Sequence, residues 1–130
     1  MREIKFRGKR VDNGEWVYGD LLTKVNELSK QPAIVCFNGS IIPKSIKVIP
    51  ETVGQFTGLC DKNGKEVYEG DVVKLGSIYY LCIIIFDKPE CGYAARSTKT
   101  GQCYGIGTDV KNRLEVIGNI HENPSLLEVN

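Results

Sequence analysis

Residues 50–74 constrain the fold more than any other stretch, because they combine two sharp turns with the starts of two strands. Residues 61–64, Asp-Lys-Asn-Gly, predict a tight hairpin turn, since Asn and Gly tolerate the positive φ values that such a turn requires. Residues 68–71 form a second turn that leads into residues 72–75, whose valines fit a pleated, half-buried surface. A glycine bend before an apolar strand is typical of small curved sheets. The stretch predicts a β-barrel or β-roll and no particular activity.

An earlier segment, residues 13–22, echoes residues 63–73. Both read Asn-Gly, two variable residues, Val-Tyr, then Gly-Asp and two aliphatic residues, with Glu69 as a one-residue insertion. A shared turn, strand, turn and strand unit, with Glu69 as a bulge, explains the match. Chance convergence of common turn residues explains it equally well, because repeat proteins usually show three or more copies.

Short strands are predicted along most of the remaining chain, because apolar residues alternate with polar ones between Gly, Asn and Pro turns. Residues 77–86 are expected to form the longest strand, buried on both faces, while residues 24–32 and 98–112 have no defined pattern. Residues 123–127 are expected to form one turn of helix or a tail packed on the barrel. The predicted strands are residues 2–7, 15–22, 33–37, 45–49, 72–75, 77–86, 93–97 and 114–120. The chain is therefore predicted to be mainly β, with little helix.

A length of 130 residues predicts a single β domain over 1–130, or two intertwined subdomains that meet near residues 50–60. The net charge of +1 provides no global field toward nucleic acid or an anionic membrane. No apolar run approaches the roughly 20 residues that span a bilayer, so no membrane partner is expected. The first residues lack the layout of a signal peptide, which predicts a cytoplasmic protein.

Five cysteines occur without a Cys-x-x-Cys pair or a histidine cluster, so no zinc site is predicted. Buried reduced thiols are the expected state. Cys91 and Cys103 flank a glycine-rich, basic segment and are the two most expected to be exposed.

The best candidate site is a basic first strand beside aromatic residues of its hairpin partner. Cations that follow phosphates, next to aromatic rings that stack on bases, are what single-strand nucleic-acid binding requires. The competing interpretation is a solvated edge strand whose cations discourage aggregation. The candidate nucleic-acid-binding residues are Lys5, Arg7, Lys9, Arg10, Trp16 and Tyr18, with Arg2 nearby.

No catalytic residue, metal site or cofactor is predicted. Asp61, Glu66, Glu69 and Asp71 could hold a divalent cation, but turn chemistry explains them more simply. His121 has no recognisable triad partner in the sequence. Residues 101–107 contain glycines but lack the Gly-Lys-Ser/Thr ending of a phosphate loop.

Three blocks of the sequence resemble the YopX family, small proteins encoded by phages and prophages. They are MREIKFRGKRVDNGEWVYGDLL, VIPETVGQFTGLCDKNGKEVYEGDVV and LEVIGNIHENPSLL. The resemblance implies an SH3-like barrel or roll elaborated with extra strands, self-association, and no established activity. In the common family form Arg7 is followed by Ala-Trp, whereas Gly8 and Lys9 follow it here, so no role of that aromatic residue is carried over.

We therefore expect a non-enzymatic, oligomeric binding module of a bacterial host cell whose partner is a host or phage protein. The alternative is a barrel that binds single-stranded or duplex nucleic acid through the basic first strand.

Overall fold

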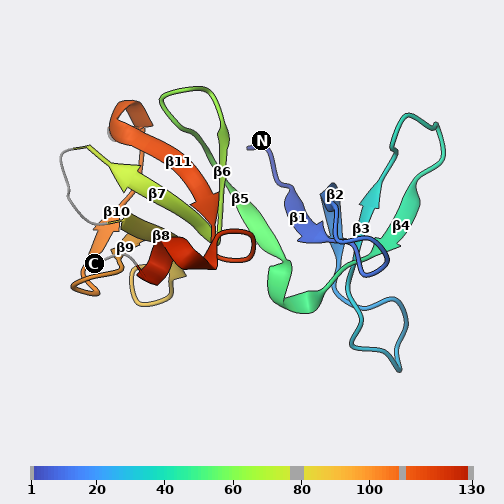
Figure 1. Ribbon diagram of the computed structural model, residues 1–130. Helices are drawn as coiled ribbons and strands as arrows, with labels where there is room; N and C mark the ends of the chain where they lie inside the picture. Colours follow the sequence, from blue (N-terminus) through green and yellow to red (C-terminus); the bar gives the residue numbers. More distant parts are fainter. Residues whose placement is uncertain (1, 77–80, 109–110, 129–130) are drawn as a thin grey trace. The chain divides into compact units, whose positions relative to one another are not determined.

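The computed structural model describes residues 2–76, 81–108 and 111–128 (Figure 1). The chain divides into two compact units, Met1–Phe56 and Thr57–Asn130. Over the described residues it contains eleven strands and three short 3₁₀ helices. The prediction of a mainly β chain with little helix is confirmed. None of the described helices has the length and apolar character needed to cross a membrane.

The strands form two antiparallel sheets, with the orders β4-β3-β2-β1-β5-β6 and β10-β9-β8-β7-β11. Within the described part of the first unit, the residue after β4, Val48, meets the residue after β1, Arg10, in an isolated antiparallel bridge. The chain turns away at residues 11–14 on one side and at Pro50 on the other, so no ladder follows the bridge. Of the predicted barrel or roll, the barrel is therefore wrong, because both sheets are open.

The first unit is built from four complete strands and the start of a fifth. Gly14 has a φ of 73° in the turn between β1 and β2, which confirms the predicted hairpin. The strand predicted from residue 2 begins only at Phe6, and Ala33, Ile34, Val48 and Phe56 form the buried centre. The elements are β1 (Phe6–Lys9), β2 (Trp16–Leu22), β3 (Ala33–Cys36), β4 (Lys44–Lys47), η1 (Pro50–Thr52) and β5 (Gly54–Cys60).

The second unit contains the larger core, and β5 ends within it. Seven buried residues pack together there, and each large aliphatic side chain contributes roughly 1.5–3 kcal/mol through burial. They are Val67, Val73, Leu75, Cys82, Ile84, Ala95 and Leu114. The elements are β6 (Glu66–Tyr68), β7 (Asp71–Leu75), β8 (Leu81–Asp87), β9 (Gly92–Ser97), β10 (Cys103–Gly105), η2 (Lys111–Arg113), β11 (Leu114–Asn119) and η3 (Pro124–Glu128).

The predicted long strand at residues 77–86 is confirmed from Leu81 onward, and residues 77–80 lie outside the described residues. Only one face of β8 is fully buried, by Cys82 and Ile84. Ile83 and Ile85 on the other face are half-buried, so the prediction of burial on both faces is wrong. The undefined segment at 98–112 contains the short edge strand β10, and η3 forms the expected helical turn near the C-terminus.

The echo between residues 13–22 and 63–73 holds at its first turn and at the strand that follows, β2 in one copy and β6 in the other, and fails at the second turn. Gly64 has a φ of 82° and Gly70 has a φ of 89°, so both occupy turns. Gly19, which aligns with Gly70, instead lies inside β2 and is paired with Phe6. The shared turn, strand, turn and strand unit is therefore wrong. Glu69 belongs to the turn between β6 and β7 and is not a strand bulge.

Candidate functional site

The β1–β2 hairpin brings the predicted cations and aromatic residues together on one face. Arg7 is paired with Tyr18 and Lys9 is paired with Trp16, and directly opposed side chains on antiparallel strands point to the same face. The two pairs are neighbours along the strands. The sequence therefore identified a real cation–aromatic cluster.

The cations of this cluster lie against its own tryptophan ring. The Arg7 guanidinium carbon lies 4.7 Å from the centre of the Trp16 ring, and the Lys9 Nζ atom lies 5.9 Å from it. Arg7 is only 6% exposed, whereas Tyr18 is 48% exposed. Cation–π contacts of this kind stabilise a fold most when they are shielded from water. Arg7 is therefore part of the packing of this unit.

The remaining predicted cations also have partners inside the first unit. Lys5 Nζ lies 5.2 Å from the centre of the Phe56 ring and 3.4 Å from a carboxylate oxygen of Glu3. Arg10 donates two hydrogen bonds to Asp12, of 2.9 and 2.8 Å. This pairing raises the pKa of Arg10 and lowers the pKa of the Asp12 carboxyl below its ordinary value. The pair is exposed to solvent, so it contributes little to stability.

The prediction of a solvated edge strand is wrong for β1. The strand pairs with β2 on one side and with β5 on the other, so its backbone is not at the edge of the sheet. Arg7 does not lie on a solvated face, because the Trp16 ring and neighbouring residues cover it. Nucleic-acid binding by these six residues stays a prediction.

Replacing Arg7 with alanine is expected to lower the free energy of unfolding by about 2 kcal/mol, because a shielded cation–π contact and buried volume are lost. Lys9→Ala is the matched control and should cost only about 0.5 kcal/mol, since Lys9 is half-buried and farther from the ring. Urea unfolding followed by circular dichroism measures both, with the single tryptophan as a second probe. Equal effects of the two substitutions would contradict a packing role for Arg7.

The two aspartates of the central stretch bind the backbone, whereas Glu66 binds a side chain. The two carboxylate oxygens of Asp61 accept three backbone N–H bonds, and Asp71 Oδ2 accepts the N–H of Tyr68 at 2.8 Å. Glu66 accepts a 3.1 Å bond from the Tyr68 hydroxyl. Turn chemistry is thus confirmed for the two aspartates. In the described ranges, no group of three or more His, Cys, Asp or Glu side chains is placed to hold a metal ion.

The cysteines differ in exposure more than the sequence indicated. Cys82 is fully buried, and burial raises the pKa of its thiol. Cys91 and Cys103 are exposed, as expected. Cys60 is also exposed, because it lies on the outward-facing side at the end of β5, so the prediction of a buried thiol is wrong there.

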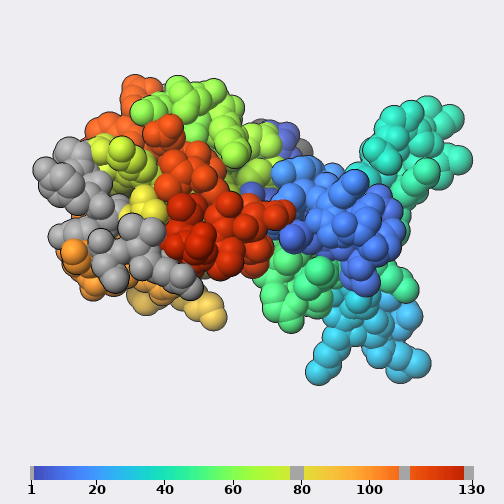
Figure 2. Space-filling model, in the orientation of Figure 1, coloured from blue at the N-terminus to red at the C-terminus, as the bar shows by residue number. Residues whose placement is uncertain are grey.

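One feature that the sequence analysis missed is the tip of the β3–β4 hairpin, residues 37–42. Phe37 is 56% exposed, Ile41 is 95% exposed and Ile42 is 68% exposed. A turn at Asn38-Gly39, with φ values of 48° and 82°, lies between these apolar residues. Figure 2 shows this hairpin, in teal, projecting from the rest of the first unit. The sequence feature that could have predicted this exposure is the pair Ile41-Ile42, which comes shortly after the predicted Asn38-Gly39 turn, where polar residues are usual.

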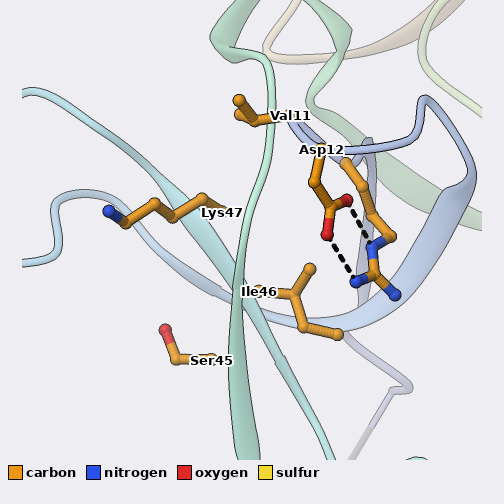
Figure 3. A pocket seen from close by; sticks show the side chains of 6 residues that line it. Val11, Asp12, Ser45, Ile46 and Lys47 are labelled. Carbon is orange, nitrogen blue, oxygen red and sulfur yellow. Dashed lines mark hydrogen bonds and ion pairs between the residues drawn. The ribbon is translucent and has the colours of Figure 1, made fainter.

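A hollow of about 340 Å³ lies beside β4. The Arg10–Asp12 ion pair and Val11 form one wall, and Ser45–Lys47 of β4 form the other. In Figure 3 the side chain of Ile46 points toward the ion pair, while Ser45 and Lys47 point away from it. A second hollow of about 360 Å³ lies beside Trp16, Val17, Cys36 and Ile46. β4 therefore presents accessible surface on its outer side as well as at its tip.

Comparison with known proteins gives a family and a fold. The crystal structure of protein EF1440 from Enterococcus faecalis is similar, with a TM-score of 0.51 and 22% sequence identity over 98% of this chain and 99% of that chain. None of the curated proteins matches the sequence. The model of the YopX protein family matches residues 5–128, which is nearly the whole chain. The recognised resemblance is thus confirmed, and the protein belongs to the YopX family.

Proposed function

We propose that the protein is a non-enzymatic, self-associating binding module, encoded by a phage or prophage and active in the cytoplasm of the bacterial host, that docks on a protein partner. The observation that carries this proposal is the β3–β4 hairpin tip. Three large apolar side chains, Phe37, Ile41 and Ile42, are exposed together on one projecting turn. Large exposed apolar patches are rare on soluble proteins, and where they occur they commonly mark interaction sites.

The charges around the tip favour an acidic protein surface as the partner. Lys44 begins β4 directly after the tip, whereas Lys47 ends that strand, paired with Ala33 and away from the tip. Both are exposed and make no ion pair with any described residue. Residues 1–56 contain nine Lys and Arg against six Asp and Glu. An unpaired cation at the rim of an apolar anchor, here Lys44, increases the rate and the selectivity of association with an acidic partner.

Nucleic acid is a weaker candidate on the same geometry. Arg7 is buried, and Lys5 and Arg10 have carboxylate partners, so few of the predicted cations are directed to solvent. The exposed ring of Tyr18 is the main feature that supports base stacking. We further propose that the first unit is SH3-like, since five short antiparallel strands curl until Arg10 bridges Val48.

Site-specific photocrosslinking in phage-infected or prophage-carrying cells tests the proposal. A photoreactive amino acid at position 41 is expected to form discrete protein crosslinks. The matched control is position 28, because Leu28 is 99% exposed in the β2–β3 loop of the same unit and should give none. Identical crosslinks at both positions, or none at either, would contradict docking by the tip.

Fluorescence anisotropy with random single-stranded and duplex oligonucleotides distinguishes the two partner classes. We expect no binding at low salt. Binding that weakens steeply with salt and is lost in Lys5→Glu/Lys9→Glu would instead establish the nucleic-acid alternative. Arg7 is left unchanged in this experiment, because its replacement is expected to perturb folding.

A further inference from the structure

We infer that the second unit binds the terminal phosphate of a small phosphorylated compound, in a basic hollow beside the β7–β11 strand pair. The hollow has a volume of about 270 Å³. Three cationic side chains line it, together with one carboxylate, one amide and one glycine. These residues are Lys62, Lys74, Gly76, Asn112, Arg113 and Glu115. All six belong to residues 57–130, so the site lies within one unit and is separate from the hairpin tip.

The register of β11 on β7 places two of the charged residues on the outer face of the sheet. Lys74 is directly opposite Glu115, whereas the neighbouring pair, Leu75 and Leu114, is buried in the core. Because successive side chains of a strand point to opposite faces, Lys74 and Glu115 point away from that core. Lys74 is accordingly exposed, and Glu115 is half-buried.

Arg113 reaches the same place from the end of η2. The backbone N–H of Gly76 donates a 2.8 Å hydrogen bond to the carbonyl oxygen of Arg113. A Cβ atom added to Gly76 would lie 3.6 Å from Arg113 Cδ and 3.9 Å from its Nη1 atom. The arginine side chain therefore extends over Gly76, just beyond the end of β7. Since glycine has no side chain, this position leaves room beside the guanidinium group.

The third cation, Lys62, is held beside β11 by its backbone. Its N–H group donates a 2.9 Å hydrogen bond to the carbonyl oxygen of Leu114, and the preceding Asp61 accepts the N–H of Val116. The Lys62 side chain therefore starts from a fixed position. Its Nζ atom lies 3.5 Å from a carboxylate oxygen of Glu115, so Glu115 balances one of the three cations.

The other two cations of the hollow have no counter-ion. Among the described residues, the side chains of Lys74 and Arg113 have neither an ion-pair nor a hydrogen-bond partner. Cations gathered in a hollow attract an anion, which also relieves their mutual repulsion. A guanidinium group can bind phosphate through two parallel hydrogen bonds, and lysine adds a compact charge. Phosphate is therefore the anion that this set of side chains fits.

A terminal phosphate fits the hollow better than a nucleic-acid backbone does. A phosphomonoester carries nearly two negative charges at one point at neutral pH. A nucleic-acid strand instead spreads single charges along its length, and proteins follow it with a continuous basic groove. In this unit the uncompensated cations converge on one hollow. Residues 57–130 as a whole are slightly acidic, with ten Asp and Glu against eight Lys and Arg.

Titration of the full, isotope-labelled chain with pyrophosphate tests the site through the chemical shifts of its backbone amides. Pyrophosphate supplies terminal phosphates without a sugar or a base, and sodium chloride keeps the ionic strength constant. Saturable shifts are expected at the amides of Gly76, Arg113 and Glu115. The absence of saturable shifts would overturn the inference, as would saturation at amides elsewhere in the chain alone.

Single substitutions separate the hollow from a general effect of charge. Lys74→Gln and Arg113→Gln should each weaken pyrophosphate binding about tenfold, because a hydrogen bond to a charged group is lost. Lys88→Gln is the matched control, because it removes the same charge from an exposed turn of the same unit and should leave binding unchanged. All three side chains are exposed, and circular dichroism checks that each variant folds. Equal effects of the three substitutions would overturn the site.

Glu115→Gln tests the site in the opposite direction. The substitution removes the carboxylate of the hollow and releases Lys62, so pyrophosphate binding should strengthen about threefold. A loss of folding cannot produce such a gain. Weaker binding by a folded variant would contradict a site built from these cations.

An oligonucleotide with hydroxyl groups at both ends distinguishes the two sources of phosphate. At an equal concentration of phosphate groups, it should shift the amides of the hollow less than pyrophosphate does. Larger shifts would overturn a terminal-phosphate site and assign the hollow to a nucleic-acid backbone. Either result leaves docking by the hairpin tip to be decided by the crosslinks from position 41.

Discussion

Replacing Gly19 with alanine is expected to lower the free energy of unfolding by about 3 kcal/mol, because β2 and β3 approach too closely there for a side chain. An added Cβ would overlap the carbonyl oxygen of Val35 and would lie 3.2 Å from both Cys36 Cβ and Ile34 Cγ2. A backbone oxygen cannot move aside without breaking strand pairing. Urea unfolding followed by circular dichroism measures the loss.

Gly14→Ala separates this crowding from ordinary backbone strain. Gly14 has a φ of 73°, but an added Cβ there meets no atom within 4 Å. The substitution should therefore cost only about 1 kcal/mol, the penalty of a left-handed backbone for alanine. A Gly19→Ala loss no larger than that of Gly14→Ala would show that β2 and β3 can separate at little cost.

The two Gly-Asp pairs explain why turns were predicted better than the fold. Gly70 is a turn former, with a φ of 89°, and the local sequence around it was sufficient to recognise this. Gly19 precedes an aspartate in the same way, yet its role depends on Val35 in another strand. Local residue chemistry predicts local backbone shape. Whether a sheet closes depends on contacts between distant residues, and the predicted barrel was wrong for that reason.

The candidate site shows the same division. The hairpin turn fixed the register of β1 on β2, so the meeting of Lys9 and Trp16 could be predicted from their spacing. The burial of Arg7 could not, because it results from the diagonal position of the Trp16 ring. The exposure of Ile41 and Ile42 was missed because apolar residues are expected to be buried, and only the projecting hairpin leaves them in solvent.

Replacing Asp61 with alanine is expected to have the largest effect, a loss of about 4 kcal/mol at neutral pH. Asp61 is 6% exposed and accepts the backbone N–H groups of Asn63 at 2.8 Å and Lys65 at 2.9 Å. Its other oxygen accepts the N–H of Val116 at 2.9 Å, which ties the turn after β5 to β11. Alanine leaves all three donors without their acceptor. Asp12→Ala is the matched control and should cost much less, because that carboxylate is exposed and its main partner is the side chain of Arg10.

The loss at Asp61 is expected to depend on pH in a defined direction. Burial raises the pKa of the Asp61 carboxyl, but its three backbone donors and the charge of Lys65 outweigh burial and hold the pKa below its ordinary value of 3.8. A carboxyl whose pKa is depressed by folding stabilises the protein above the pKa of the unfolded chain. That stabilisation is lost as the pH falls through the folded pKa. The difference in free energy of unfolding between the natural chain and Asp61→Ala should therefore be constant near neutral pH and shrink below about pH 4. Urea midpoints measured at several pH values test this, and a difference that stays constant into strong acid would show that the charge of Asp61 does not stabilise the fold.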